Sequence, residues 1–342
     1  MIDRRALSAV LAVLLAAGLA AGLAACGERN EPTPGGGRSQ KIDLVLDYFP
    51  NADHAGIYNA IGTGEFKKVG LDVKPRTPSD PSAPLKLLSA GRADLVISYE
   101  PELLLARAKG AKLVAIGALV QKPLTSIMSI GHKAIRDPGE LEDAKIGTAG
   151  IPYQDAYLKT IVDKAGIDPG RVHTINVGFN LVPAMLTKKV DATLGAFWNV
   201  EGVELERRHK QPKILRMDEV GVPTYNELVV VAREQDVRKR GPLLRRFMRA
   251  LALGHQTLRS NIDGAVDELV KANPDLDRKL QRAQVKATLP VFFPAGKDRP
   301  FGYQDPAAWK RYTQWMLDND LLANPVAANR AMTNEFLPGE GI

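Results

Sequence analysis

The sequence predicts an α/β protein with two lobes, a hinge and a ligand cleft between the lobes. Three observations support this prediction. Short apolar strands alternate with helical stretches from Lys41 onward, a second series of the same kind follows, and the chain becomes helical after about Gln235. Alternation of this kind is typical of a mostly parallel sheet covered by helices. Because two series follow in tandem, we expect one lobe at 41–127 and 232–342 and the other at 128–231.

The first series divides into elements by its apolar spacing. Its strands are expected at residues 41–49, 71–77, 95–99 and 112–120, and its helices at 54–69, 81–94 and 100–111. Pro50 removes a backbone donor and biases Phe49 toward an extended conformation, so it ends the first strand. Asp53 is expected to cap the helix that follows.

The second series repeats the alternation. Its strands are expected at 144–150, 172–178 and 191–198 and its helices at 153–167 and 181–190, before a last strand at 225–234. The hinge is expected near the stretches "TSIMSI" and "NELVVVA". Ligands of open α/β sheets bind beyond the carboxyl ends of the strands, and clefts between lobes are favoured pockets. We therefore look for functional residues at strand ends.

The N-terminus has the pattern of an export signal. Arg4 and Arg5 precede an uncharged apolar run that ends with "LAAC" at the single cysteine, Cys26. A basic start followed by an apolar run is typical of a secretory signal peptide, and "LAAC" resembles the lipobox of bacterial lipoproteins. We expect a signal peptide at 1–25, lipidation at Cys26, a flexible tether at 26–40, and a protein anchored by lipid on the extracytoplasmic face of the membrane. A transmembrane anchor with an incidental cysteine is the alternative.

Composition and motifs exclude several classes of function. The chain has a formal net charge of +7 and no nucleic-acid-binding motif, and the positive surface suits an anionic cell envelope. One cysteine leaves no intramolecular disulfide. Metal-ligand and nucleophile motifs such as H-E-x-x-H, C-x-x-C and G-x-S-x-G do not occur. We therefore expect a protein that is not an enzyme and that uses neither a cofactor nor a metal.

Four segments carry a resemblance to a known family. They read "LDYFPNADHAGIYNAIGTGEF", "GRADLVISYEPELLLARAKG", "NVGFNLVPAMLTKKVDATLGAFWNVEGVEL" and "GYQDPAAWKRYTQWMLDNDLL". The chain resembles solute-binding lipoproteins of ABC importers over about residues 41–340, and in particular the family that binds thiamine pyrimidine precursors and is related to the fungal thiamine-pyrimidine synthase. The resemblance implies the type II periplasmic-binding-protein fold, a monomer, a membrane permease as partner, and an aminopyrimidine such as formylaminopyrimidine as solute.

The first candidate site lies in the corner after the first strand. Pro50 and Asp53 are explained by the turn itself, whereas Tyr48, Asn51 and His54 are not. These side chains follow a strand end where the floor of a cleft is expected. The resemblance also places this stretch at the ligand. We therefore assign the three residues to solute binding.

Further candidates follow other strand ends. Glu201 lies just beyond the strand "VDATL", and its carboxylate is suited to accept hydrogen bonds from a ring nitrogen and the exocyclic amine of an aminopyrimidine. Aromatic side chains are expected to form walls against the flat ring. The remaining candidates are Ser98, Tyr99, Tyr153, Phe179, Asn180, Trp198 and Asn199.

Two alternatives stay open. A riboflavin-binding component of an importer has the same fold and transport role. The alternative from another class is a pyrimidine-forming enzyme that consumes His54 with pyridoxal phosphate, as the kinship with the fungal synthase implies. That enzyme carries a cysteine-rich iron-binding motif, which is missing here because Cys26 is the one cysteine of the chain.

Overall fold

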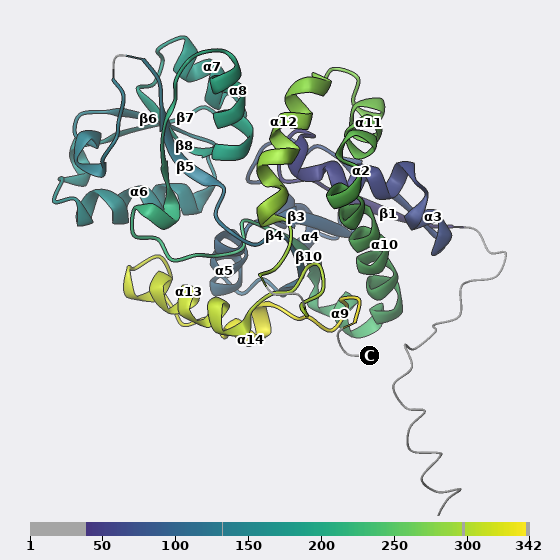
Figure 1. The fold of residues 1–342 in the computed structure, drawn as a ribbon. Coiled ribbons are helices and arrows are strands. Elements are labelled where there is room, and N and C mark those ends of the chain that lie inside the picture. The colour runs from purple at the N-terminus through teal and green to yellow at the C-terminus, as the bar shows by residue number, and fades with distance from the viewer. Residues whose placement is uncertain (1–38, 132, 296–297, 340–342) are drawn as a thin grey trace, which may run out of the picture.

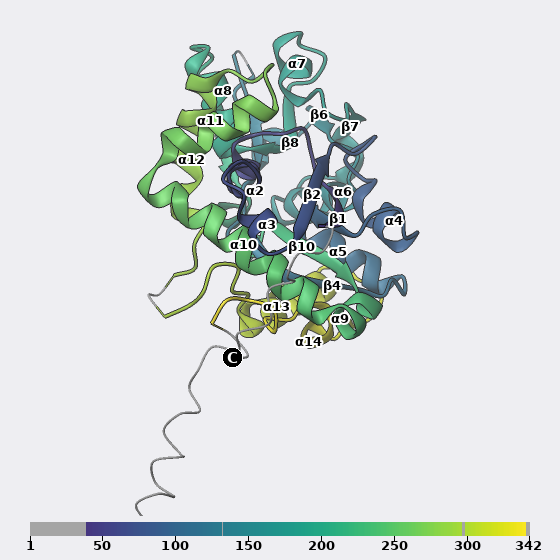
Figure 2. The same ribbon diagram turned by 90° about the vertical axis from the view of Figure 1, so that its right-hand side faces the viewer.

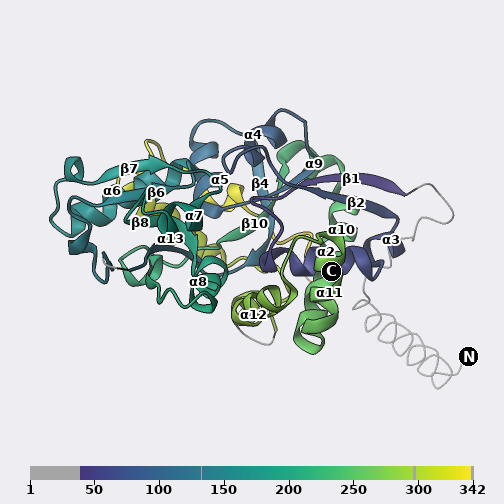
Figure 3. The ribbon, with the colours of Figure 1, turned by 90° about the horizontal axis from the view of Figure 1, so that it is seen from above.

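The structure is a computed structural model that describes residues 39–131, 133–295 and 298–339. The expected signal peptide, most of the tether and Cys26 lie outside these residues. Two lobes, each built on a five-stranded sheet, stand side by side (Figures 1 and 3). Within the described part of the chain, no helix is long and apolar enough to cross a membrane.

The first lobe contains the sheet β2-β1-β3-β10-β4. Its strands are β1 (Gln40–Val45), β2 (Leu71–Arg76), β3 (Leu95–Ser98), β4 (Leu113–Val120) and β10 (Leu228–Arg233). β1 pairs in parallel with β2 and β3, whereas β10 runs antiparallel between β3 and β4. The helices of this lobe are η1 (Ala52–His54), α2 (Ala55–Gly62), α3 (Glu65–Lys68), α4 (Pro84–Ser89), α5 (Glu100–Ala108), α9 (Glu234–Lys239), α10 (Gly241–Ser260), α11 (Ile262–Ala272), α12 (Arg278–Thr288), η6 (Leu289–Val291), α13 (Pro306–Asp318) and α14 (Ala328–Ala331).

The second lobe contains the sheet β7-β6-β8-β5-β9. Its strands are β5 (Thr125–Ser129), β6 (Lys145–Thr148), β7 (His173–Asn176), β8 (Ala192–Phe197) and β9 (Lys213–Arg216). β6 pairs in parallel with β7 and β8, and β5 runs antiparallel between β8 and β9. Its helices are η2 (Pro138–Leu141), α6 (Pro152–Lys164), η3 (Pro169–Arg171), α7 (Leu181–Leu186), the π-helix η4 (Trp198–Gly202), α8 (Val203–Arg207) and η5 (Met217–Glu219).

The expected two-lobed α/β fold is confirmed, with shifts at particular elements. The helix expected at 54–69 is divided into η1, α2 and α3, and Gly64 between α2 and α3 has a left-handed φ of 78°. All of β5 pairs in the second sheet and all of β10 in the first. The chain therefore crosses between the lobes just before Thr125 and Leu228, a few residues ahead of the expected boundaries.

The edge of the first sheet at β4 is covered by the C-terminal part of the chain. All eight residues of β4 are buried. Thr333 N–H donates to Ala115 O and Ala118 N–H donates to Gly302 O, so the outer strand does not present a free hydrogen-bonding edge. α9, α13 and α14 lie at the opposite end of the molecule from α7 in both side views (Figures 1 and 2).

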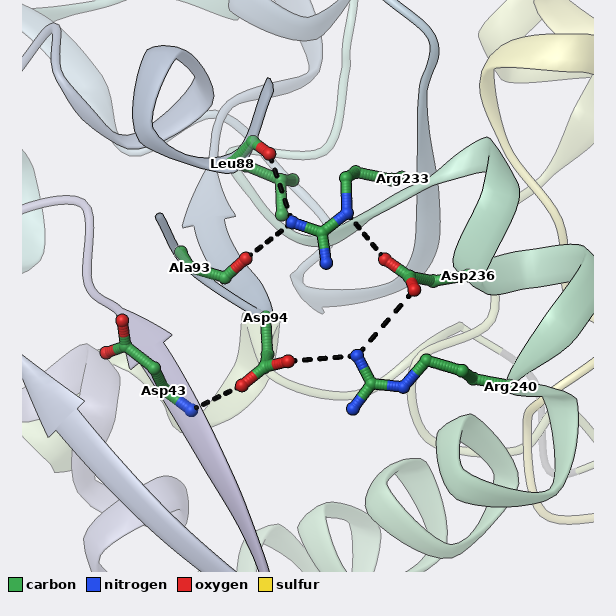
Figure 4. A network of polar contacts seen from close by, with 7 residues as sticks. All are labelled: Asp43, Leu88, Ala93, Asp94, Arg233, Asp236 and Arg240. Atoms are coloured by element: carbon green, nitrogen blue, oxygen red, sulfur yellow. Dashed lines mark hydrogen bonds and ion pairs between the residues drawn. The ribbon is translucent and has the colours of Figure 1, made fainter. Parts of the chain in front are cut away.

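A polar network fastens the returning chain to the first lobe (Figure 4). Asp94 accepts from the backbone N–H of Asp43 at 3.0 Å and from Arg240 Nη1 at 2.9 Å. Arg233 pairs with Asp236 at 2.7 Å and also donates to the carbonyls of Leu88 in α4 and of Ala93 in the α4–β3 connection. The network joins β1, α4, β10, α9 and the segment before β3, so it belongs to one lobe and not to the interface between the lobes.

A second polar cluster holds the two crossing segments together. Glu227 is fully buried, and its Oε2 accepts from Leu124 N–H at 2.6 Å, from Thr125 N–H at 2.8 Å and from the Tyr225 hydroxyl at 3.1 Å. Its Oε1 accepts from the Thr125 hydroxyl at 2.9 Å. Glu100 of α5 accepts from both the backbone and the side-chain N–H of Asn226 at 2.7 Å. These contacts define the hinge.

Candidate ligand site between the lobes

A small cavity lies between the two lobes, with a volume of about 20 Å³ open to a water-sized sphere. This is room for about one water molecule and not for a substituted ring, so the lobes must separate to admit a solute. The first lobe contributes Asp47, Tyr48, Asn51 and Tyr99, and the second contributes Ala149, Ile151, Tyr153, Gln154, Leu181, Gly195, Phe197, Val200 and Glu201. Many of these residues follow the carboxyl ends of β1, β3, β6 and β8, which is where open α/β sheets bind ligands.

Asp47 is a central residue of the cavity that sequence reasoning missed. Its side chain is 1% exposed, Oδ2 accepts from the Tyr99 hydroxyl at 2.9 Å, and Oδ1 lies 2.9 Å from His54 Nε2. A signal was present, because an acid interrupts the apolar run "LVLDYF" at the expected strand end. A buried carboxylate with bonded oxygens is held in a fixed orientation toward the cavity.

His54 supports Asp47 from behind and is not among the residues that line the cavity. It is fully buried, and its Nδ1 accepts from Asn51 N–H at 3.2 Å. This contact assigns the proton to Nε2, which donates to Asp47. Both ring nitrogens are therefore engaged in the fold, and a direct contact between His54 and a solute stays a prediction.

Asn51 lines the cavity and also begins the first helical turn. Its Oδ1 accepts from Asp53 N–H at 2.8 Å, and its Nδ2 donates to Phe49 O at 3.0 Å. The expectation that Asp53 caps this helix is wrong, because η1 begins at Ala52 and the preceding residue is the cap. The Asp53 side chain instead points toward the other lobe.

Glu201 places a second carboxyl group at the cavity, from the lobe opposite Asp47. Its Oε2 accepts from Phe197 N–H at 2.7 Å, which leaves Oε1 for a ligand. Burial raises the pKa of Glu201 to about 8, against the lowering effect of the backbone donors, and the negative charges of Asp53 and Glu204 add to the rise. A ligand that donates hydrogen bonds to this carboxylate would favour its charged form.

Aromatic rings form much of the cavity wall. Tyr99 lies 5.6 Å from Tyr153 and 6.5 Å from Phe197, between ring centroids, so rings of both lobes meet beside Asp47. The Tyr48 hydroxyl donates to Phe179 O at 2.7 Å across the interface. The Phe179 ring packs 4.8 Å from Tyr48 and 4.4 Å from Phe49, but Phe179 is not among the lining residues, and its contact with a solute stays a prediction.

Other predicted residues lie near the cavity without lining it. Ser98 is buried at the end of β3, and Asn180 is exposed in front of α7. Trp198 donates from Nε1 to Pro123 O at 3.0 Å, and the Arg216 guanidinium lies 4.1 Å from its ring centroid. Asn199 is fully buried and bonds to Asp53 across the interface. Their contact with a solute stays a prediction.

The lining residues have a consistent chemical character. Asp47 and Glu201 are acids, Asn51 and Gln154 are amides, and the cavity wall holds no lysine, arginine or histidine among the described residues. The described residues also contain no group of three or more side chains that could hold a metal ion. The site is suited to a flat, uncharged or cationic molecule that donates hydrogen bonds.

Comparison with known proteins gives a consistent result. A family model described as "NMT1/THI5 like" matches residues 51–265. A formylaminopyrimidine-binding protein from Halalkalibacterium halodurans is 31% identical over 297 residues, which cover 86% of this chain and 90% of that protein. A 4-amino-5-hydroxymethyl-2-methylpyrimidine phosphate synthase from Saccharomyces cerevisiae is 23% identical over 310 residues, covering 87% of this chain and 88% of the synthase.

Solved structures confirm the fold. The alkanesulfonate-binding protein SsuA from Xanthomonas axonopodis pv. citri, bound to MOPS, superposes with a TM-score of 0.67 at 16% identity. The match covers 87% of this chain and 98% of that protein. The likeness establishes the two-lobed periplasmic-binding-protein architecture.

Proposed function

This chain belongs to the NMT1/THI5-like family, and on that premise we propose that it is a solute-binding protein that captures a thiamine pyrimidine precursor between its lobes. The observation that carries the proposal is the cavity itself, in which a carboxylate from each lobe and aromatic rings from both lobes converge. An aminopyrimidine such as formylaminopyrimidine has the matching chemistry, because it combines a flat ring with amine donors.

The contacts that the cavity residues provide account for binding in the micromolar range. Glu201 Oε1 and the Asp47 carboxylate would accept hydrogen bonds from the exocyclic amine and from a protonated ring nitrogen, at about 1.5–3 kcal/mol each. Stacking on an aromatic wall adds about 0.5–1.5 kcal/mol per ring pair beyond the burial of area. Together with burial of the ring, these contributions reach the roughly 8 kcal/mol of a micromolar complex.

The acidic residues of the cavity favour the proposed pyrimidine over a sulfonate, the ligand class of the structural relative. SsuA is described as alkanesulfonate-binding, and a sulfonate is an anion. Here the described wall presents Asp47 and Glu201 and no basic side chain. These acids offer a sulfonate no positive charge to pair with, whereas their oxygens suit a donor-rich pyrimidine.

The synthase and flavin alternatives have less support. A pyrimidine-forming enzyme would need a lysine to hold pyridoxal phosphate, but the described wall of the cavity has none, and both nitrogens of His54 are bonded within the fold. A flavin is set apart by the comparison with known proteins, since the relative that is 31% identical is described as formylaminopyrimidine-binding.

We infer the cellular setting from the N-terminus and the fold. The basic start, the apolar run and "LAAC" support export and lipidation at Cys26, on residues outside those that the structure describes. A lipid-anchored binding protein on the extracytoplasmic face would present its closed form to an ABC permease. Uptake of the precursor would then supply thiamine biosynthesis.

Calorimetric titration of the purified protein with formylaminopyrimidine tests the proposal. We expect one-to-one binding that Glu201→Gln weakens by at least about tenfold, because an amide replaces one acceptor by a donor. Glu206→Gln is the matched control, since Glu206 lies on the adjoining helix α8, is exposed and does not line the cavity. Binding of riboflavin but not of the pyrimidine would overturn the proposed solute.

A further inference from the structure

Asn199 was expected to contact the solute, but it joins the two lobes outside the cavity. It lies in the π-helix η4 of the second lobe and is fully buried. Its Nδ2 donates to Asp53 Oδ1 and to Thr288 Oγ1, both at 2.6 Å. Asp53 belongs to η1 and Thr288 ends α12, so one side-chain amide of the second lobe holds two elements of the first.

A second amide contact reinforces this junction one turn earlier on α12. Gln284 Nε2 donates to Val200 O at 2.9 Å, again from the first lobe to η4. α12 stands beside the second lobe, close to α8, in Figures 1 and 3. Gln284 and Thr288 therefore face η4 from consecutive turns of one helix.

The junction is incompletely bonded. Asp53 Oδ2 and Asn199 Oδ1 are buried and have no hydrogen-bond partner among the described residues. Burial raises the pKa of Asp53 to about 7. His54, next to Asp53, opposes this rise, Asp47 in the preceding segment adds to it, and the Asn199 and Thr288 bonds oppose it. Glu201 of η4 is the further acid that faces Asp53 from the opposite lobe.

We propose that Asp53, Asn199 and Thr288 form an interlobe latch that sets the affinity for the solute without touching it. The latch rests on the proposed function, because its effect is exerted through closure of the lobes around a ligand. None of its three residues lines the cavity. Its bonds join groups of different lobes, so they form when the lobes close and break when the lobes separate.

The latch would act on affinity through the population of the closed form. Contacts that exist in the closed form alone favour closing, with or without solute. When the closed form is the binding-competent form, the apparent dissociation constant is inversely proportional to its population. Weakening the latch therefore raises the apparent dissociation constant, chiefly through faster dissociation, because a closed complex must open before the solute leaves.

The test uses Asn199→Ala in the complete protein, with formylaminopyrimidine as the probe. We expect the dissociation constant to rise about tenfold, the value for one charge-assisted hydrogen bond. Asp53→Ala should behave alike, whereas Asp53→Asn keeps an acceptor for Asn199 and should restore most of the affinity. Small-angle scattering should show a larger radius of gyration for Asn199→Ala than for the wild type.

The matched control is Asn59→Ala. Asn59 is also buried, and its Nδ2 donates to Gly254 O at 2.9 Å, but this bond lies within the first lobe. The control should lower the melting temperature and leave the dissociation constant unchanged. Thr288→Val, which removes another partner of Asn199, should also raise the dissociation constant. Its control is Thr313→Val, because Thr313 bonds to Trp309 O within α13.

The outcomes separate the latch from the proposed function. A dissociation constant for Asn199→Ala within about twofold of the wild type, or an equal rise for Asn59→Ala, would overturn the latch and leave the solute assignment intact. If the wild type binds no pyrimidine, the proposed function fails. In that case, small-angle scattering of the ligand-free protein tests the latch alone. A larger radius of gyration for Asn199→Ala than for the wild type supports the latch, and identical scattering profiles of the two proteins contradict it.

Discussion

The two lobes meet at a hinge and at a latch, and each contains a buried acid with a different set of partners. At the hinge, both oxygens of Glu227 are bonded, and its donors include two backbone N–H groups of the crossing chain. At the latch, Asp53 has donors on Oδ1 and none on Oδ2 among the described residues. The hinge therefore resembles a permanent part of the core, whereas the latch resembles an interface that separates.

The covalent arrangement explains the difference. Glu227 and its partners lie on the segments that carry the chain between lobes, so their spacing changes little when the lobes move. η4 and α12 belong to different lobes and are joined through side chains. Chain connectivity holds the hinge together although Glu100 Oε1 there also has no hydrogen-bond partner among the described residues, whereas contacts through side chains alone keep the closed and open forms close in free energy.

The largest effect is expected from breaking the hinge. Glu227→Ala leaves the N–H groups of Leu124 and Thr125 without their side-chain acceptor in a buried setting. We expect the free energy of unfolding to fall by on the order of 3 kcal/mol, measured by urea denaturation. Glu227→Gln keeps an acceptor and should lose less. Equal stability of Glu227→Ala and the wild type would contradict a structural role for the hinge acid.

A change of pH should act on the latch more than on the hinge. With the lobes closed, the Asp53 pKa is about 7, and solvation in the open form would return it toward the ordinary value of about 4. The closed form then binds more protons between these values, so closure is favoured at mildly acidic pH and weakens as pH rises through about 7.

Scattering of the ligand-free protein between about pH 5 and about pH 8 measures this dependence. The radius of gyration should increase with pH, and Asp53→Asn should reduce the increase. Glu201 has a pKa of about 8 at the same interface and acts in the same direction, so part of the dependence should remain in that variant. A radius of gyration that decreases with rising pH would refute the assignment of Asp53 as an acid that favours closure when protonated.

A smaller effect is expected at the rim of the cavity. Tyr48→Phe removes the hydroxyl that donates to Phe179 O and keeps the ring contacts. We expect the dissociation rate of the solute to rise about threefold to tenfold in stopped-flow measurements, as for one neutral hydrogen bond. Tyr58→Phe, a tyrosine buried in the first lobe away from the cavity, is the control and should leave the rate unchanged.

The smallest effect is expected from the network within the first lobe. Arg240→Ala removes a partly exposed pair with Asp94, which should cost about 1 kcal/mol or less of folding stability. The dissociation constant should not change, because the network does not reach the interface. A loss of affinity in this variant would show that the rigidity of one lobe, and not the latch alone, sets closure.

The sequence was a good guide to the fold because strand and helix periodicity is a local property. It placed a site after β1, and Glu201, Tyr99, Tyr153, Tyr48 and Asn51 do line the cavity of the structure. Asp47 was not predicted as a site residue, because an acid at a strand end also suits a turn. Its partners Tyr99 and His54 are identified by tertiary contacts alone.

The roles of Asp53 and Asn199 could not be predicted for the same reason. Near a helix start, Asn51 and Asp53 are equally plausible caps, and the choice depends on where the first turn begins. Asn199 directly follows an aromatic residue at a strand end, which favours a ligand contact on position alone. Its bond to Asp53 joins residues 146 positions apart, and no local pattern encodes such a pairing.

The order of strands in the first sheet determines which lobe can fold first during synthesis. β10 lies between β3 and β4, although well over a hundred residues separate β3 from β10 in sequence. A nascent chain that has not yet reached Leu228 therefore lacks an inner strand of this sheet, and β3 and β4 have no partner between them. The second lobe, which is continuous in sequence, can form earlier, and the first must wait for the return of the chain. Polypeptides cut short before that return would expose two unpaired β edges, which makes them targets for aggregation and proteolysis.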